Sequence, residues 1–146
     1  MKSLFFIAGF IFIAVSGYSK EFFESRMEYW NKSPDEVIAF EKLSGEKTEL
    51  LRKGEVFINY AIIIYDTPCR FYYYYNTNDL VAIGYKIPKK LLTKVTKSLS
   101  KYFGKPAGIE NPIETDIYHI SVLTNSLDSE TFQLQFFNKK TQSGTN

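Results

Sequence analysis

Histidine and cysteine, which often carry catalysis or bind metals, occur once each in this chain of 146 residues, as His119 and Cys69. In an extended segment His119 shares a side with Ser121, but no serine elbow and no second histidine accompany it. One histidine and one cysteine do not complete the usual ligand set of zinc. Arg70 follows Cys69 and its charge can favour a thiolate, yet the sequence places no base beside that thiol. We therefore predict no metal site and no catalytic centre at these residues.

Two carboxylate pairs are the other candidates for chemistry. Asp35 and Glu36 lie where a helix is expected to begin, and Asp128 and Glu130 lie in an expected turn. Neither pair is placed across a cleft, as the acid and base of a glycosidase must be. A glycine-lysine-proline segment lacks the flanking residues of a phosphate-binding loop. The sequence thus predicts a non-catalytic protein without a cofactor, and a hydrolase that uses the histidine or a carboxylate pair is the less favoured alternative.

Four consecutive tyrosines, in the segment RFYYYYN, stand before a turn and a returning strand, LVAIGYKI. Strand alternation sends neighbouring side chains to opposite faces, so Tyr72 and Tyr74 share one face and Tyr73 and Tyr75 share the other. With Tyr75 paired to Leu80, one face of the hairpin carries Phe71, Tyr73, Tyr75, Leu80, Ala82 and Gly84. The other carries Arg70, Tyr72, Tyr74, Val81, Ile83 and Tyr85.

The second of these faces is our first candidate site, because aromatic residues with a nearby arginine are typical of binding hot spots. The residues predicted to bind a partner protein are Arg70, Tyr72, Tyr74, Val81, Ile83 and Tyr85. A structural alternative is that both faces are buried, one by helices and the other by the N-terminal segment EFFESRMEYW. A second copy of the chain can also cover an apolar face, so a homodimer is a further alternative.

A further alternative is a small apolar or sugar ligand held between sheet and helices. Trp30, Tyr73 and Tyr75 would supply rings for stacking and polar groups for hydrogen bonds. This hypothesis requires a persistent cavity beside those three side chains.

The elements that must position these residues are two helices and a run of strands. Ser33, Pro34 and Glu36 form a capping box that predicts a helix ending before Gly45. A second helical pattern begins at Pro88 and ends at Gly104, with lysines on its polar side. Three or four strands separate the helices, and two more follow. We predict a two-layer α+β fold in which both amphipathic helices cover one face of an antiparallel sheet.

The first residues predict export. Lys2 precedes an apolar run from Leu4 to Val15, and small residues follow it, as in a secretory signal peptide; an uncleaved anchor is the alternative. We expect a signal peptide at 1–19, one domain at 20–137 and a flexible polar tail at 138–146. The expected product is periplasmic or secreted and has no stable membrane span after cleavage. A balance of 18 basic and 16 acidic residues excludes a strong electrostatic case for nucleic acid, so we expect an envelope or extracellular protein as partner.

The capped SPDEV helix preceded by Trp30, the hairpin spacing of Tyr73, Tyr75 and Tyr85, and the KYFGKP helix end resemble small exported bacterial proteins of unknown function. The helix-plus-hairpin layout is similar to that of outer-membrane assembly lipoproteins of the SmpA/OmlA type and of β-lactamase inhibitor protein. This resemblance implies a non-catalytic envelope protein that works through a sheet surface, without assigning a role to any single residue.

Overall fold

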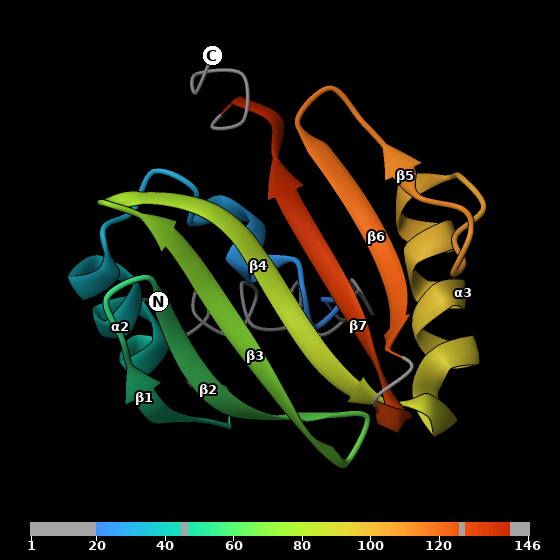
Figure 1. The fold of residues 1–146 in the computed structure, drawn as a ribbon, viewed down its shortest axis with the longest axis horizontal. Coiled ribbons are helices and arrows are strands. Elements are labelled where there is room, and N and C mark those ends of the chain that lie inside the picture. The colour runs from blue at the N-terminus through green and yellow to red at the C-terminus, as the bar shows by residue number, and fades with distance from the viewer. Residues whose placement is uncertain (1–19, 45–46, 126–127, 141–146) are drawn as a thin grey trace, which may run out of the picture.

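The computed structural model describes residues 20–44, 47–125 and 128–140 and has an α+β fold (Figure 1). Within these residues seven strands form one antiparallel sheet in the order β1-β2-β3-β4-β7-β6-β5. The strands are β1 (Thr48–Lys53), β2 (Phe57–Ile64), β3 (Thr67–Asn76), β4 (Asp79–Pro88), β5 (Ile113–Glu114), β6 (Tyr118–Asn125) and β7 (Asp128–Asn138). The helices are α2 (Pro34–Leu43) and α3 (Leu92–Phe103), with short 3₁₀ turns η1 (Ser25–Glu28) and η2 (Lys89–Leu91). The predicted α+β class with an antiparallel sheet is confirmed.

The capping box that begins α2 is present. The Ser33 hydroxyl accepts a hydrogen bond from the backbone N–H of Glu36 at 3.3 Å, and the Glu36 carboxylate accepts one from the Ser33 N–H at 3.2 Å. Proline occupies the first helical position. These two bonds satisfy donors that a helix start otherwise leaves unpaired, which explains why this helix was predictable from a few residues.

The second predicted helix starts later than expected. Pro88 ends β4 and the turn η2 follows before α3 begins at Leu92. The helix ends at Gly104, whose φ of 67° is the left-handed conformation that glycine adopts without steric cost. Near its middle, Ser98 hydrogen-bonds the hydroxyl of Tyr65 at 2.8 Å, which ties α3 to the β2–β3 turn.

The β3–β4 hairpin contains a β-bulge that changes the predicted faces. Tyr75 pairs with Leu80 as expected, but Tyr74 pairs with Ala82, so Val81 is an additional residue in β4. An extra residue in one strand reverses the alternation beyond it. Ile83 therefore pairs with Tyr73 and lies on the same side of the sheet as that tyrosine.

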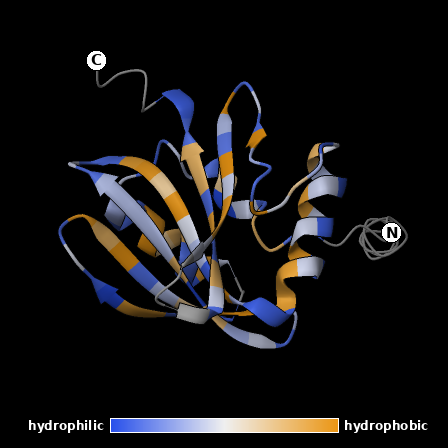
Figure 2. Cartoon of the chain, turned by 45° about the vertical axis from the view of Figure 1, so that its right-hand side comes forward, coloured by the Kyte–Doolittle hydropathy of each residue, from blue (hydrophilic) through white to orange (hydrophobic). Residues whose placement is uncertain are grey.

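The core lies on the side of the sheet that carries Phe71, Tyr73 and Tyr75. Side chains of β2, β4, β6 and β7 join it, together with Val37 of α2 and Val95 of α3. Along the strands hydrophobic residues alternate with hydrophilic ones (Figure 2). This alternation gives each strand one face in the core and one face outside it.

The N-terminal segment packs into this same core. Phe23 is buried and its ring lies 5.5 Å from that of Phe136 and 6.0 Å from that of Phe103. Arg26 is also buried, with its guanidinium 4.3 Å above the ring of Phe71. The alternative in which this segment covers the opposite face of the hairpin is therefore wrong.

Strand β2 is covered on one face, since Ile63 is 45% exposed. Strand β1 forms one edge of the sheet. The expected bounds of the tail need correction. Asn138 belongs to β7 and is buried rather than starting a free tail. The predicted signal peptide and residues 141–146 lie outside the described residues, and none of the helices within those residues is long and apolar enough to cross a membrane.

Candidate functional site: the open face of the sheet

The sheet face opposite the core, called here the open face, is organised in three rows that cross the strands. Strand pairing aligns its side chains from β2 through β3, β4 and β7 to β6. The middle row is Asn59, Tyr72, Gly84, Gln135 and Ser121. One neighbouring row is Phe57, Tyr74, Ala82, Phe137 and His119, and the other is Ala61, Arg70, Lys86, Gln133 and Leu123. Residues in a row are neighbours across strands about 4.8 Å apart, so the open face is a continuous surface.

A hollow of about 300 Å³ lies in the centre of this surface, lined by Tyr72, Tyr74, Gly84, Tyr85, Lys86, Gln133 and Gln135. Tyr72 and Tyr74 stack with ring centroids 5.9 Å apart and planes 16° from parallel. A Cβ added to Gly84 would stand 3.1 Å from the ring of Tyr74, so the missing side chain allows that ring to lie over the strand. Burial raises the pKa of the Tyr74 phenol, and the neighbouring Tyr72 raises it further. The hydroxyl therefore remains a neutral donor at physiological pH.

Amide and cationic groups border the hollow. The Gln135 side-chain amide donates to the side-chain oxygen of Gln133 at 3.1 Å. Arg70 of β3 pairs directly with Lys86 of β4. These two residues bring two cationic side chains to this end of the face. A second hollow of about 400 Å³ continues past Arg70 and Lys86 toward β1.

Apolar residues surround these polar groups on the described part of the open face. Leu51 and Leu123 are each 42% exposed. The Arg52 guanidinium lies over the ring of Phe57, 5.6 Å from the ring centroid. A surface that combines exposed apolar groups, aromatic rings and arginine has the composition of interface centres.

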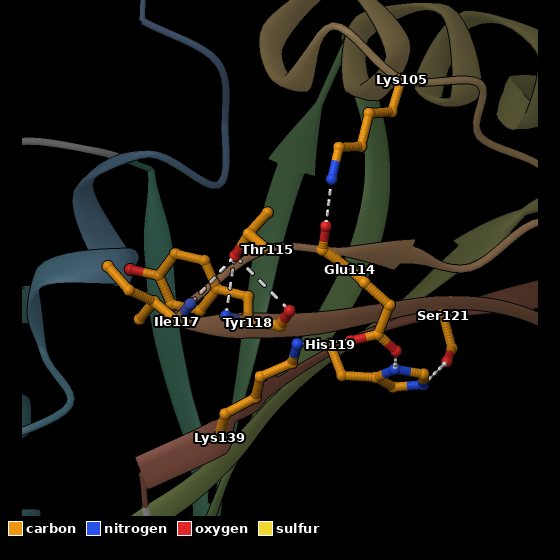
Figure 3. A network of polar contacts seen from close by, with 8 residues as sticks. All are labelled: Lys105, Glu114, Thr115, Ile117, Tyr118, His119, Ser121 and Lys139. Carbon is orange, nitrogen blue, oxygen red and sulfur yellow. Dashed lines mark hydrogen bonds and ion pairs between the residues drawn. The ribbon is translucent and has the colours of Figure 1, made fainter.

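The histidine at the β6 end of the face has Ser121 as one partner and Glu114, which the sequence did not reveal, as the other (Figure 3). Its Nδ1 contacts the Glu114 carboxylate, and its Nε2 lies 2.9 Å from the hydroxyl of Ser121. Lys139 Nζ lies 2.7 Å from the other oxygen of Glu114. Lys139 most strongly, and His119 after it, hold the pKa of Glu114 below its ordinary value. The carboxylate is therefore ionised at neutral pH.

The residues predicted to bind a partner do not all lie on one face of the sheet. Arg70 is exposed and Tyr72 and Tyr74 are half-buried on the open face. Ile83 and Tyr85 are about 1% exposed and belong to the core, so their expected place beside Tyr72 is wrong. Val81 is the half-buried bulge residue. The bulge is the cause, because the extra residue Val81 shifts the pairing by one. Each later residue of β4 therefore lies on the face opposite to the one expected. Gly84 and Lys86 occupy the positions expected for Ile83 and Tyr85.

The residues proposed to hold a small ligand between sheet and helices pack in the core or against it. Tyr73 is fully buried and its hydroxyl donates to the Glu41 carboxylate at 2.5 Å. Tyr75 is buried, and its hydroxyl donates to the backbone oxygen of Lys32 at 3.2 Å. Trp30 lies against Tyr118 with ring centroids 5.8 Å apart. Each of the three side chains thus contacts another part of the protein, and these contacts do not outline a cavity that all three share.

The described residues contain no group of three or more histidine, cysteine, aspartate or glutamate side chains that could hold a metal ion. Cys69 is buried and free, and burial raises the pKa of its thiol to about 11. Of the carboxylate pairs, Asp35 contacts Lys53 at 2.8 Å and Glu36 caps α2.

Comparison with known proteins gives no relative: no family model, no curated protein and no solved structure matches the chain. The similarity in layout to the SmpA/OmlA lipoproteins and to β-lactamase inhibitor protein therefore stays a prediction.

Proposed function

We propose that this chain is an exported protein-interaction module that binds an envelope or extracellular protein through the open face of its sheet. The observation that carries the proposal is the position of Tyr72 and Tyr74, stacked beside a hollow on the sheet face opposite the core. We also infer a two-layer domain, because Val37 of α2 and both Val95 and Leu99 of α3 join one core cluster with Tyr73. Export rests on the predicted signal peptide.

Charge complementarity supports a protein partner with acidic groups. Arg52, Arg70 and Lys86 all project from the open face, and Arg70 stands directly opposite Lys86. An acidic side chain of the partner would pair with the exposed Arg70, while apolar side chains beside it would cover Leu51 and Leu123. The partner is thus expected to present a surface that mixes carboxylates with apolar residues, and binding should weaken as salt is raised.

Affinity capture from solubilised envelope of the producing cell tests this proposal. The double variant Tyr72→Ser/Tyr74→Ser removes the stacked rings, and Tyr102→Ser is the matched control because that tyrosine is 43% exposed on α3. The proposal expects one acidic protein, captured by the natural chain and the control and lost in the double variant. Equal capture by all three chains would overturn it.

Two further variants separate binding from folding. Gly84→Ala pushes the Tyr74 ring out of its place over β4 and leaves the core intact, so capture should fall while the unfolding temperature changes little. Arg70→Glu reverses the charge of an exposed side chain and should weaken capture most at low salt. Size-exclusion chromatography shows whether the occupant is instead a second copy of the chain, which would replace the acidic partner.

A further inference from the structure

The three side chains of Glu114, His119 and Ser121 form a hydrogen-bonded chain at the β6 end of the open face. His119 and Ser121 are two residues apart in β6 and therefore project from the same side. Glu114 pairs with His119 across β5 and β6, which brings its carboxylate to Nδ1 of the ring. In Figure 3 the imidazole lies between the glutamate and the serine.

This order fixes which nitrogen can accept a proton. The ionised carboxylate of Glu114 can only accept a hydrogen bond, so Nδ1 of the imidazole carries the hydrogen. In the neutral ring Nε2 then has its lone pair directed at Ser121, whose hydroxyl oxygen lies 2.9 Å away. A hydroxyl that donates to such a nitrogen can lose its proton to it as it attacks a carbonyl carbon.

The glutamate is held in place by two lysines. Lys139 Nζ lies 2.7 Å from its second carboxylate oxygen, and Lys105 donates to its backbone oxygen. Lys139 is in turn placed by its backbone N–H, which donates to the oxygen of Ile117 at 2.9 Å. The orientation of the imidazole thus has a fixed support, as the carboxylate of a catalytic triad provides.

The constellation is accessible and adjoins the central hollow. The side chains of His119 and Glu114 are 34% and 51% exposed. Ser121 pairs with Gln135, and Gln135 pairs with Gly84 in the floor of the hollow. Two strand spacings, about 10 Å, therefore separate the serine from Gly84 in the floor of the hollow.

We propose that Ser121 is the nucleophile of an acyl-transfer site in which His119 is the general base and Glu114 is a positioning residue, acting on small carboxylic esters. The serine oxygen bonds to the ester carbonyl carbon while its proton passes to His119 Nε2. The bond from that carbon to the alkoxy oxygen then breaks, and the proton passes from Nε2 to the departing alcohol. Water repeats the sequence on the acyl-serine and releases the carboxylic acid.

The site is tested with the purified protein and p-nitrophenyl acetate, followed by intact-mass analysis and peptide mapping. The proposal expects one acetyl group at Ser121 and catalytic release of nitrophenol, and a fluorophosphonate probe should label the same serine. Ser121→Ala should abolish both signals. His119→Gln should slow acylation by about 10²- to 10⁴-fold, the usual contribution of a positioned general base.

Ser98→Ala is the matched control, because that hydroxyl is half-buried and hydrogen-bonded but lies on α3 beside Tyr65. It should react like the natural chain. Acylation at another residue, or an equal rate after His119→Gln, would overturn the proposal. The thermal unfolding midpoint of each variant shows that a lost signal is not a lost fold.

The positioning role of Glu114 has its own readout. Nitrogen NMR of the imidazole should report the Nδ1–H tautomer in the natural chain and a mixture of tautomers in Glu114→Gln, together with acylation slowed about tenfold or more. An unchanged tautomer with an unchanged rate would remove Glu114 from the site. Neither result depends on the partner protein, because capture by Tyr72 and Tyr74 is measured separately.

Discussion

Replacing Arg26 by methionine should strongly destabilise this protein, because the arginine neutralises a carboxylate inside the core. Its Nε and Nη2 donate to the two oxygens of Glu41 at 3.0 and 3.2 Å, and both side chains are 1% exposed. Its Nη1 donates to the backbone oxygen of Phe22 at 2.9 Å. The Glu41 carboxylate also accepts from the hydroxyls of Tyr73 and Thr48. Arg26 is thus one part of a polar network whose ion pair is fully buried.

Removing one member of a buried ion pair costs about 3–5 kcal/mol, since the other charge stays behind without compensation. For a domain of this size that loss corresponds to about 10–20 °C in the unfolding midpoint. In Arg26→Met/Glu41→Leu both charges are absent, and the remaining cost is that of the hydroxyl and carbonyl partners left unpaired, about 1–3 kcal/mol. The double variant should therefore be more stable than Arg26→Met.

Urea unfolding followed by tryptophan fluorescence measures these free energies, with circular dichroism for the midpoints. Tyr73→Phe is the matched control for the network, because it removes one donor to Glu41 and leaves the ion pair in place. It should cost about 1–2 kcal/mol. A loss below about 1 kcal/mol for Arg26→Met, or a double variant less stable than that single variant, would refute the reasoning.

Three other perturbations have expected outcomes. Burial raises the pKa of the Cys69 thiol from its ordinary value of 9.0 to about 11, so the thiol should react with a thiol reagent at pH 8 only on unfolding. The contribution of this thiol to the free energy of unfolding should fall as pH rises from 9 to 11, because the unfolded state ionises first. Gly104→Ala should cost about 1 kcal/mol because its φ is 67°, whereas Asp66→Gly, at φ 59°, should gain up to about 1 kcal/mol; urea titration measures both. The pKa of Glu114 is lowered, so its ion pairs should persist at pH values below the ordinary pKa of a glutamate and be lost only as pH falls through the lowered pKa. Carbon NMR of that carboxylate can follow this titration.

Elements marked by local chemistry could be predicted from the sequence. The capping box at Ser33 and Glu36, the left-handed stop at Gly104 and the alternation of the tyrosines each depend on a few neighbouring residues. The β-bulge at Val81 has no comparable local pattern, because any apolar residue can occupy it. That single position decided which residues of β4 lie beside Tyr72 and which enter the core.

Contacts between distant segments could not be predicted in this way. Arg26 and Glu41 are 15 residues apart, and the sequence gives no sign that either is buried. Spacing did place Ser121 on the same side as His119, and the structure adds Glu114 from the two-residue strand β5. A strand that short has no alternation to detect, so the third member of that constellation required the folded chain.

The most direct test of the central claim, that the open face binds a partner protein, is site-specific photo-crosslinking in the producing cell. A benzophenone amino acid placed at Tyr74 lies at the central hollow, and the same probe at Tyr102 lies on α3. The account predicts one discrete crosslinked protein from position 74, absent from position 102 and lost when Arg70→Glu is added. Crosslinks from position 102 alone, or none from position 74 in a stably folded chain, would contradict it.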